Sequence, residues 1–279
     1  KKSFCRYKFV SQFWIDVTML LPRLIPMLLV REKGLVKTTK FTDDKYVGDP
    51  LNAVRIFNEK CVDEIIVLDI DATVKGKDPD FKMIENLASE CRMPLCYGGG
   101  IKTVEQAVKI LSLGVEKVSL SAAAIQNPNL IKEIADKVGS QSVVVTLDVK
   151  RKHFGGFDVL THNGTKSTKR SPVDLALKFQ DLGAGELVLN SIDNDGLMTG
   201  YDLKLVGEVK KHMTLPMTLV GGCGTFQDVE ALHAQEGLIG AAAGSFFVFK
   251  GKYHAVLITY PSEDMRLSIS NLFNSISAT

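Results

Sequence analysis

Short apolar runs recur along this chain, separated by segments in which apolar residues return every three or four positions. The runs predict eight strands, near residues 24–30, 65–70, 94–98, 117–121, 143–148, 186–191, 216–221 and 239–244. Helical spacing predicts helices over 80–90, 103–113, 128–138, 172–182, 203–212 and 226–235. Near-continuous apolar strands that alternate with amphipathic helices indicate a parallel sheet covered by helices.

Eight strand–helix units in roughly 250 residues predict a single closed (β/α)8 barrel, the TIM barrel. An open doubly wound sheet is the alternative, but eight near-equal units favour closure, and the chain has neither GxGxxG nor a Walker loop. We predict a barrel over residues 19–262, an N-terminal extension of unknown role over 1–18, with Met19 as a candidate natural start, and a C-terminal helix or tail over 263–279.

Two pairs of segments resemble each other at an offset of about 120 residues, the kind of internal period that marks a repeat. Glycines cluster after a strand at 98–100 and again at 221–224. The apolar run 63–71 ends in acidic residues, and the run 185–193 repeats that pattern. We therefore predict a two-fold duplication of half-barrels.

Composition narrows the function. The 45% hydrophobic residues suffice for a large core, and a net charge of +2 argues against a nucleic-acid or membrane partner. No apolar run reaches the roughly 18 residues that span a bilayer, and no signal-peptide pattern follows residues 12–30, so we predict a cytoplasmic protein. Scattered histidines and cysteines without CxxC spacing predict no metal and no cofactor.

In a barrel of this kind the active site lies at the carboxyl ends of the strands. Polar residues expected there are Asp69, Asp148, Asn190, Ser191, Asp193 and Asp195. Asp148 ends an apolar run, and as a general acid–base group it would contribute about 10² to 10⁴ in rate. The structural alternative is an aspartate that caps the following loop.

Two sets of small residues predict phosphate grips, because glycine lets backbone N–H groups approach an anion. Gly99, Gly100 and Ser121 form one set, and Gly196, Gly222, Gly244 and Ser245 form the other. Two such grips on one barrel mouth suit an elongated substrate with a phosphate at each end. The alternative is tight turns that require positive φ angles.

The chain resembles the cyclase subunit (HisF) of imidazole glycerol phosphate synthase from about residue 23 to 260. The resemblance rests on Asp49-Pro50, Leu68-Asp69-Ile70, Gly98-Gly99-Gly100-Ile101, Gly139-Ser140-Gln141, Gly183-Ala184-Gly185-Glu186, the segment 191–196 of sequence SIDNDG, and Gly200-Tyr201-Asp202. The related isomerase of the same pathway shares the duplicated half-barrel but lacks the SID-x-DG and GSQ segments in this form, and is the lesser match.

The resemblance implies a heterodimer with a glutaminase subunit of the HisH type, docked at the N-terminal face. Ammonia would pass through the barrel to a bisphosphorylated ribulosyl substrate, giving imidazole glycerol phosphate and an aminoimidazole carboxamide ribotide. Residues that match the family's charged ammonia gate are Arg23, Glu64, Lys117 and Glu186. A structural ion-pair network is the alternative for these four.

The resemblance is incomplete at the active-site end. Asp148 matches one of the family's two catalytic aspartates, but Leu29 stands where the other belongs. Ser121, Ala122 and Val220 replace Asn, Thr and Ser of the family. Lys37, expected in a flexible loop after the first strand, is retained as a substrate-contacting residue, with a solvated lysine as the alternative, and so is Asp69.

Three functions stay open at this point. The first is the family's cyclase reaction, perturbed by Leu29. The second is a paralogue that supplies ammonia to a sugar-amidating enzyme in surface-polysaccharide synthesis; an intact gate beside a lost carboxylate favours this one. The third is a non-catalytic scaffold that activates the glutaminase by docking.

Overall fold

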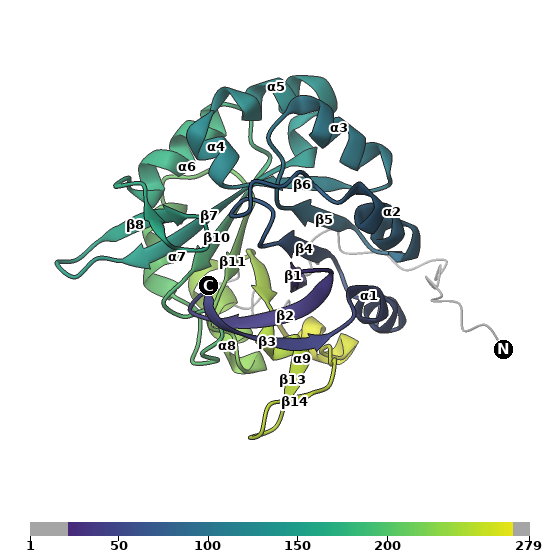
Figure 1. Ribbon diagram of the computed structural model, residues 1–279. Helices are drawn as coiled ribbons and strands as arrows, with labels where there is room; N and C mark the ends of the chain where they lie inside the picture. Colours follow the sequence, from purple (N-terminus) through teal and green to yellow (C-terminus); the bar gives the residue numbers. More distant parts are fainter. Residues whose placement is uncertain (1–21, 270–279) are drawn as a thin grey trace, which may run out of the picture.

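The computed structural model describes residues 22–269, and eight of its strands close into a parallel barrel (Figure 1). Each barrel strand pairs in parallel with the next, and the last returns to the first. In order they are β1 (Leu24–Arg31), β4 (Ile65–Asp69), β5 (Leu95–Gly98), β6 (Lys117–Leu120), β7 (Val143–Arg151), β10 (Glu186–Ser191), β11 (Met217–Val220) and β12 (Gly240–Ala243). The predicted closed barrel is confirmed, and the open sheet is wrong. The half-barrel duplication stays a prediction.

Helices surround the barrel on its outside (Figure 1). The long ones are α1 (Pro50–Glu59), α2 (Phe81–Glu90), α3 (Val104–Ser112), α5 (Asn129–Val138), α6 (Pro172–Asp181), α7 (Leu203–Lys210) and α8 (Phe226–Glu236). All except α1 correspond to predicted helices. Helix α1 begins with a clear signal: Asp49 accepts a hydrogen bond from the Asn52 N–H (2.9 Å), and Pro50 occupies the first turn.

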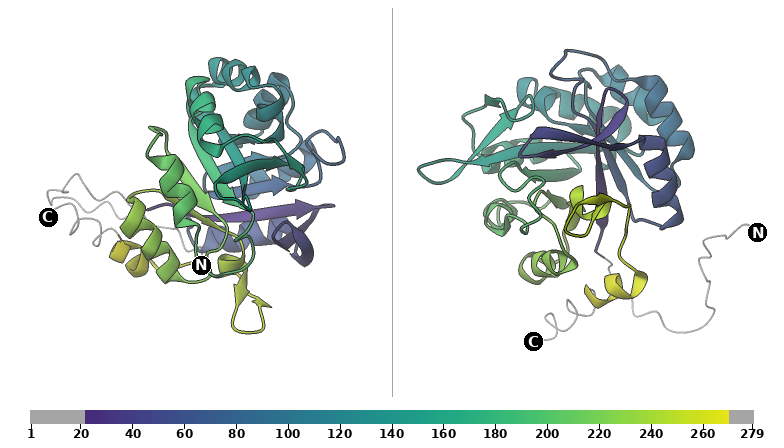
Figure 2. Two further views of the ribbon diagram at one scale, coloured as in Figure 1. Left: turned by 90° about the vertical axis from the view of Figure 1, so that its left-hand side faces the viewer. Right: turned by 60° about the horizontal axis from the view of Figure 1, so that its bottom comes forward.

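Antiparallel hairpins extend the barrel in two segments for which no element was predicted. After β1 come β2 (Gly34–Thr39) and β3 (Thr42–Gly48), and after β7 come β8 (Phe157–Thr161) and β9 (Lys166–Ser167). The segment after the first strand, expected as a flexible loop, is thus paired to β1. Shorter elements are α4 (Ala122–Gln126), a 3₁₀ turn (Ser140–Ser142), α9 (Ser245–Val248), β13 (Phe249–Lys250) and β14 (Ala255–Val256). The β13–β14 hairpin projects from the body (Figure 2).

The barrel has two separate apolar clusters. The larger one lies between the strands and the helices and includes Phe57, Ile110 and Phe179. The smaller one fills the inside of the barrel, and six of its members form an apolar layer across the middle: Ile25, Ile66, Cys96, Val144, Val188 and Ala242. Because strand side chains alternate, residues two positions away on the same strands point inward at either end of the barrel.

Within the described residues, the last barrel strand is followed by the four-residue helix α9 rather than by a long helix. After α9 and the β13–β14 hairpin, Ile258 and Tyr260 pack on the outer core, and residues 263–269 are helical, with Ile269 buried. The predicted C-terminal element is described only to residue 269. The predicted N-terminal extension, 1–18, lies outside the described residues.

Candidate active site

A cavity opens at the carboxyl ends of the barrel strands and encloses about 1270 Å³, counting the solvent at its mouth. We call it the mouth cavity. Every residue predicted to bind substrate lines it: Lys37, Asp69, Gly99, Gly100, Ser121, Asp148, Asn190, Asp195, Gly196, Gly222, Gly244 and Ser245. Ser191 and Asp193, also expected at the strand ends, are not among its lining residues, and Asp193 instead accepts a hydrogen bond from the Arg151 N–H (2.7 Å).

Asp148 stands on the inward face of β7, two residues after Thr146. Its Oδ1 accepts a hydrogen bond from Asn190 Nδ2 at 3.0 Å, across the β7–β10 pair. Burial raises the pKa of Asp148 to about 7, and the nearby Asp195 carboxylate adds to the rise, whereas Asn190 opposes it. A carboxyl group with a pKa near neutrality both donates and accepts protons, which suits the predicted acid–base role.

Asp148→Asn is expected to gain stability over the wild type as the pH rises. Between its ordinary value of 3.8 and about 7, the folded protein holds a proton that the unfolded chain releases, so the wild type loses stability across this window. Urea unfolding should show equal stabilities below pH 4 and an advantage of roughly 2–4 kcal/mol for the variant at pH 8. The exposed Asp136→Asn serves as control; parallel curves for Asp148→Asn and wild type contradict the prediction.

Lys37 is buried rather than solvated, so the alternative of a solvated lysine is wrong. Its Nζ donates to the Met27 carbonyl oxygen at 2.6 Å. Burial lowers the pKa of Lys37 to about 8, against the attraction of Asp195. Gly244 makes room for this amine, because a Cβ at that position would overlap Lys37 Nζ.

Asp195 anchors the β2–β3 hairpin over the cavity. Its Oδ2 accepts hydrogen bonds from Thr38 Oγ1 (2.8 Å) and from the Phe41 N–H (3.3 Å). Burial raises the pKa of Asp195, although these two donors and Lys37 act against the rise. The hairpin therefore brings Lys37 and Thr38 into the cavity from a segment that lies far from Asp195 in the sequence.

Asp69 caps the loop that follows its strand, which is the structural alternative for an aspartate at a strand end. Its Oδ1 accepts hydrogen bonds from the N–H groups of Asp71 and Ala72, both at 3.0 Å, and so caps the loop after β4. Burial raises its pKa in spite of these donors. Asp148, by contrast, is bonded to a side chain on the neighbouring barrel strand.

The residues of the two predicted phosphate grips follow five strands: β5 and β6 for the first grip, and β10, β11 and β12 for the second. Ser121 precedes α4 and makes no capping hydrogen bond with its side chain, and Ser245 begins α9. At Gly222 the φ angle is +102°, and a Cβ would overlap the Gly200 carbonyl oxygen. The tight turn thus explains that glycine by itself, and the phosphate role of both sets stays a prediction.

Leu29 occupies the inward face of β1 at the rim of the cavity. Together with Leu68 it packs against the inner apolar cluster. Strands β1 and β7 are the first and fifth of eight and lie on opposite sides of the barrel. The side of the mouth across from Asp148 is therefore apolar at this position.

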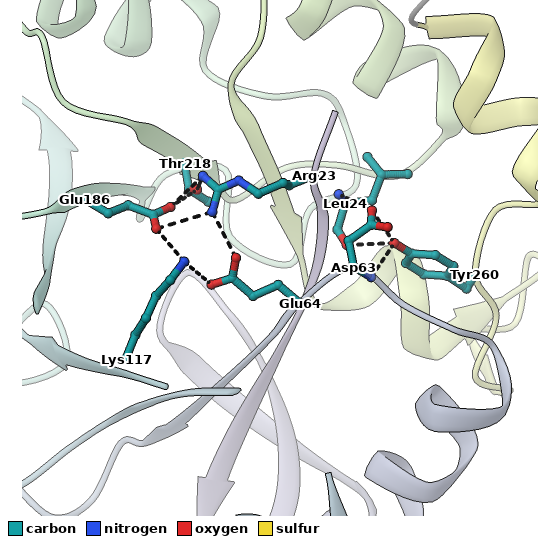
Figure 3. A network of polar contacts seen from close by, with 8 residues as sticks. All are labelled: Arg23, Leu24, Asp63, Glu64, Lys117, Glu186, Thr218 and Tyr260. Atoms are coloured by element: carbon teal, nitrogen blue, oxygen red, sulfur yellow. Dashed lines mark hydrogen bonds and ion pairs between the residues drawn. The ribbon is translucent and has the colours of Figure 1, made fainter. Parts of the chain in front are cut away.

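The other end of the barrel carries a closed charged ring of Arg23, Glu64, Lys117 and Glu186 (Figure 3). Arg23 bonds Glu64 at 2.9 Å and Glu186 at 2.8 Å. Lys117 Nζ bonds the same two carboxylates at 2.9 and 3.0 Å. The sequence placed these four residues at the starts of their strands, and the structure brings them together.

The ring carboxylates are almost fully buried, with side-chain exposures of 5% for Glu64 and 7% for Glu186. Burial by itself raises the pKa of Glu186, but Arg23 and Lys117 overcome it and hold the pKa below its ordinary value. For Lys117, burial acts to lower the pKa and the two carboxylates raise it more. Lys117 and Glu186 are therefore charged at neutral pH, and the ring combines two carboxylates with two basic groups.

Among the cavity-lining residues that sequence reasoning missed are Thr38, His162 and Asn163. The last two stand at positive φ angles in the turn between β8 and β9, where Asn163 Nδ2 donates to the Ile70 carbonyl oxygen at 2.9 Å. The Asn163-Gly164 pair is a strong hairpin-turn signal. This pair indicates a turn, but it does not indicate that the turn lies over the mouth.

Residues 22–269 contain no group of three or more histidine, cysteine or acidic side chains arranged to hold a metal. In the same range, no helix has the length and apolar character that crossing a membrane requires.

Comparison with known proteins defines the class. The profile of the family described as "Histidine biosynthesis protein" matches residues 23–254. A Vibrio vulnificus protein, named provisionally as imidazole glycerol phosphate synthase subunit hisF3, is 61% identical over 88% of this chain and 94% of its own length. A Pseudomonas aeruginosa protein named provisionally as subunit hisF2 is 52% identical over 86% and 95%. The Exiguobacterium sibiricum subunit HisF is 39% identical over 82% and 91%.

A (β/α)8 barrel with these matches belongs to the histidine biosynthesis protein family. Within that family the chain is a divergent paralogue of the HisF subunit, since relatives at 52–61% identity carry hisF2 and hisF3 names.

Proposed function

We propose that this chain is the ammonia-conducting barrel subunit of a glutamine amidotransferase. A glutaminase of the HisH type docks at the N-terminal face in the cytoplasm, and ammonia enters there and leaves through the mouth cavity. The observation that carries the proposal is the closed charged ring at one end of a barrel whose other end opens into a cavity with Asp148.

The barrel interior suits a small neutral molecule. On β10 the inward positions run from Glu186 in the ring, through Val188 in the apolar layer, to Asn190 in the cavity. An ammonium ion would lose its hydration in that layer at high cost, whereas neutral ammonia would not. Above the layer, the hydroxyls of Ser119 and Thr146 lie 2.7 Å apart and line the cavity, where they offer ammonia its first polar partners.

Leu29 decides what the subunit does with the ammonia. The family's ring closure uses two carboxylates, and leucine neither gives nor accepts a proton, so cyclisation of the bisphosphorylated ribulosyl substrate is expected to be slow or absent. All four residues of the ammonia gate are retained, whereas the acid–base pair at the opposite end of the barrel is incomplete. This combination favours delivery of ammonia over cyclisation. The acceptor that we favour is a sugar bound to an amidating enzyme of surface-polysaccharide synthesis, docked at the mouth.

Blocking the apolar layer tests conduction. Val144→Phe fills the barrel interior, and with the HisH-type glutaminase it should abolish product formed from glutamine while product formed from ammonium chloride persists. The reporter is imidazole glycerol phosphate, measured in the Leu29→Asp background, which supplies the carboxylate that the wild-type mouth lacks. The control is Val74→Phe at a half-exposed site after β4. Failure of the two chains to form a complex refutes the proposed partner, and unchanged glutamine-driven product in Val144→Phe favours the scaffold.

A further inference from the structure

A second polar network lies beside the charged ring on the N-terminal face and includes a residue from the end of the described chain (Figure 3). The Tyr260 hydroxyl lies 2.9 Å from the Leu24 carbonyl oxygen and 2.8 Å from Asp63 Oδ2, and its single hydrogen is donated to one of them. It also accepts a hydrogen bond from the Asp63 N–H at 3.2 Å. One phenol thus joins the starts of two barrel strands.

Arg266, on the C-terminal helical turn, completes this network. Its guanidinium bonds Asp63 Oδ1 at 2.6 Å and lies over the Tyr260 ring, 5.4 Å from the ring centroid. Asp63 Oδ2 also accepts the Leu24 N–H at 3.1 Å. Both oxygens of the Asp63 carboxylate are therefore held, one by the strand β1 backbone and Tyr260, the other by Arg266.

The network is directly connected to the ring through the backbone. Tyr260 contacts Leu24 and Asp63. Each is the chain neighbour of a ring residue, because Leu24 follows Arg23 and Asp63 precedes Glu64. Arg23 and Glu64 themselves bond at 2.9 Å, a contact that depends on the spacing between the starts of β1 and β4. Holding Leu24 against Asp63 fixes that spacing.

We propose that Tyr260 and Arg266 are positioning residues for the charged ring, and that the C-terminal segment acts as a clamp that sets the ring's geometry. Its effect on ammonia transfer rests on the proposed function; its effect on the ring does not. Phe247 holds the C-terminal segment in place through two contacts. The Tyr260 ring stacks on the Phe247 ring with centroids 5.5 Å apart, and the Thr259 N–H donates to the Phe247 carbonyl oxygen at 2.9 Å.

The test removes the Tyr260 hydroxyl. Tyr260→Phe keeps the stacked aromatic side chain, and ¹⁵N spectra of the lysine ammonium groups report the state of the charged ring in the isolated barrel. Exchange of the Lys117 ammonium hydrogens with water should become about tenfold faster, the scale of one lost hydrogen bond to a charged group. Arg266→Lys, which retains a cation for Asp63, should give a smaller increase. Tyr253→Phe, at an exposed hairpin tip, is the matched control and should change nothing.

A second readout tests the functional consequence. In the complex with the glutaminase and in the Leu29→Asp background, the ratio of glutamine-driven to ammonium-driven imidazole glycerol phosphate should fall several-fold when Tyr260→Phe is added and stay unchanged when Tyr253→Phe is added. Unchanged Lys117 exchange in both Tyr260→Phe and Arg266→Lys overturns the clamp, even if both variants melt earlier than the wild type. If Leu29→Asp forms product from ammonium chloride but none from glutamine in the complex, the proposed function fails, while faster Lys117 exchange in Tyr260→Phe still supports the clamp.

Discussion

Lys117→Met is expected to lower the free energy of unfolding by about 3–5 kcal/mol, the cost of leaving a buried charge unpaired. Glu64 and Glu186 would each lose a cation at 2.9–3.0 Å, and the neutral ring would acquire a net negative charge. In the complex, the same change should abolish glutamine-driven product while ammonium-driven product remains. Urea unfolding at pH 7 and the two product assays measure both effects.

A surface lysine provides the matched control. Lys132 bonds Asp136 at 2.8 Å, but both side chains are more than 60% exposed, so Lys132→Met should change stability by less than about 1 kcal/mol.

The pH dependence of the Lys117→Met deficit gives a further check. The ring cations hold the pKa of Glu186 below its ordinary 4.5, so the ring contributes its stability above that value and loses it as the pH falls below it. The deficit of Lys117→Met should therefore shrink on acidification below pH 4.5, and a deficit that stays constant as the pH falls well below 4.5 contradicts this origin.

Leu29→Asp is expected to raise cyclase turnover with ammonium chloride by about 10² to 10⁴, the usual contribution of a placed acid–base group. The new carboxylate would stand on β1, across the mouth from Asp148 on β7, and line the same cavity. Formation of imidazole glycerol phosphate from the bisphosphorylated ribulosyl substrate measures the gain.

Leu29→Asn is the control that distinguishes proton transfer from the mere presence of a polar side chain. Asparagine has nearly the same shape as aspartate but does not titrate, so Leu29→Asn should give no gain in cyclase turnover. The aspartate should also raise the pKa of Asp148 above 7 through like-charge repulsion, which shifts the pH optimum upward. A folded Leu29→Asp protein with turnover no greater than that of Leu29→Asn refutes the idea that this carboxylate is what cyclisation lacks.

The barrel strands were readable from the sequence because each is a short apolar run, buried on both faces. The β2–β3 hairpin was not, because its residues are mixed in polarity and β3 is largely exposed. Helix α1 has a start signal that does not depend on apolar periodicity, because Asp49 caps its first turn and Pro50 is its first residue.

The candidate site was predictable as a set of residues and less so in its details. Strand-end position correctly placed Asp69 and Asp148 in one cavity, but the hydrogen bonds that make the first a loop cap and the second a partner of Asn190 depend on tertiary contacts. The burial of Lys37 depends on a hairpin that the sequence did not reveal. His162 enters the cavity only because the β8–β9 turn folds over it.

The apolar layer in the middle of the barrel divides the molecule into two chemically independent halves. Ile25, Val144 and Val188 separate the charges of the ring from those around Asp148. Substitutions at the rim, such as those at position 29, therefore leave the charged ring electrostatically undisturbed. Under the proposed function, a lineage is free to exchange the recipient of the nitrogen while it keeps the same supplier, and new acceptors are best engineered by altering only the half of the barrel that holds the mouth cavity.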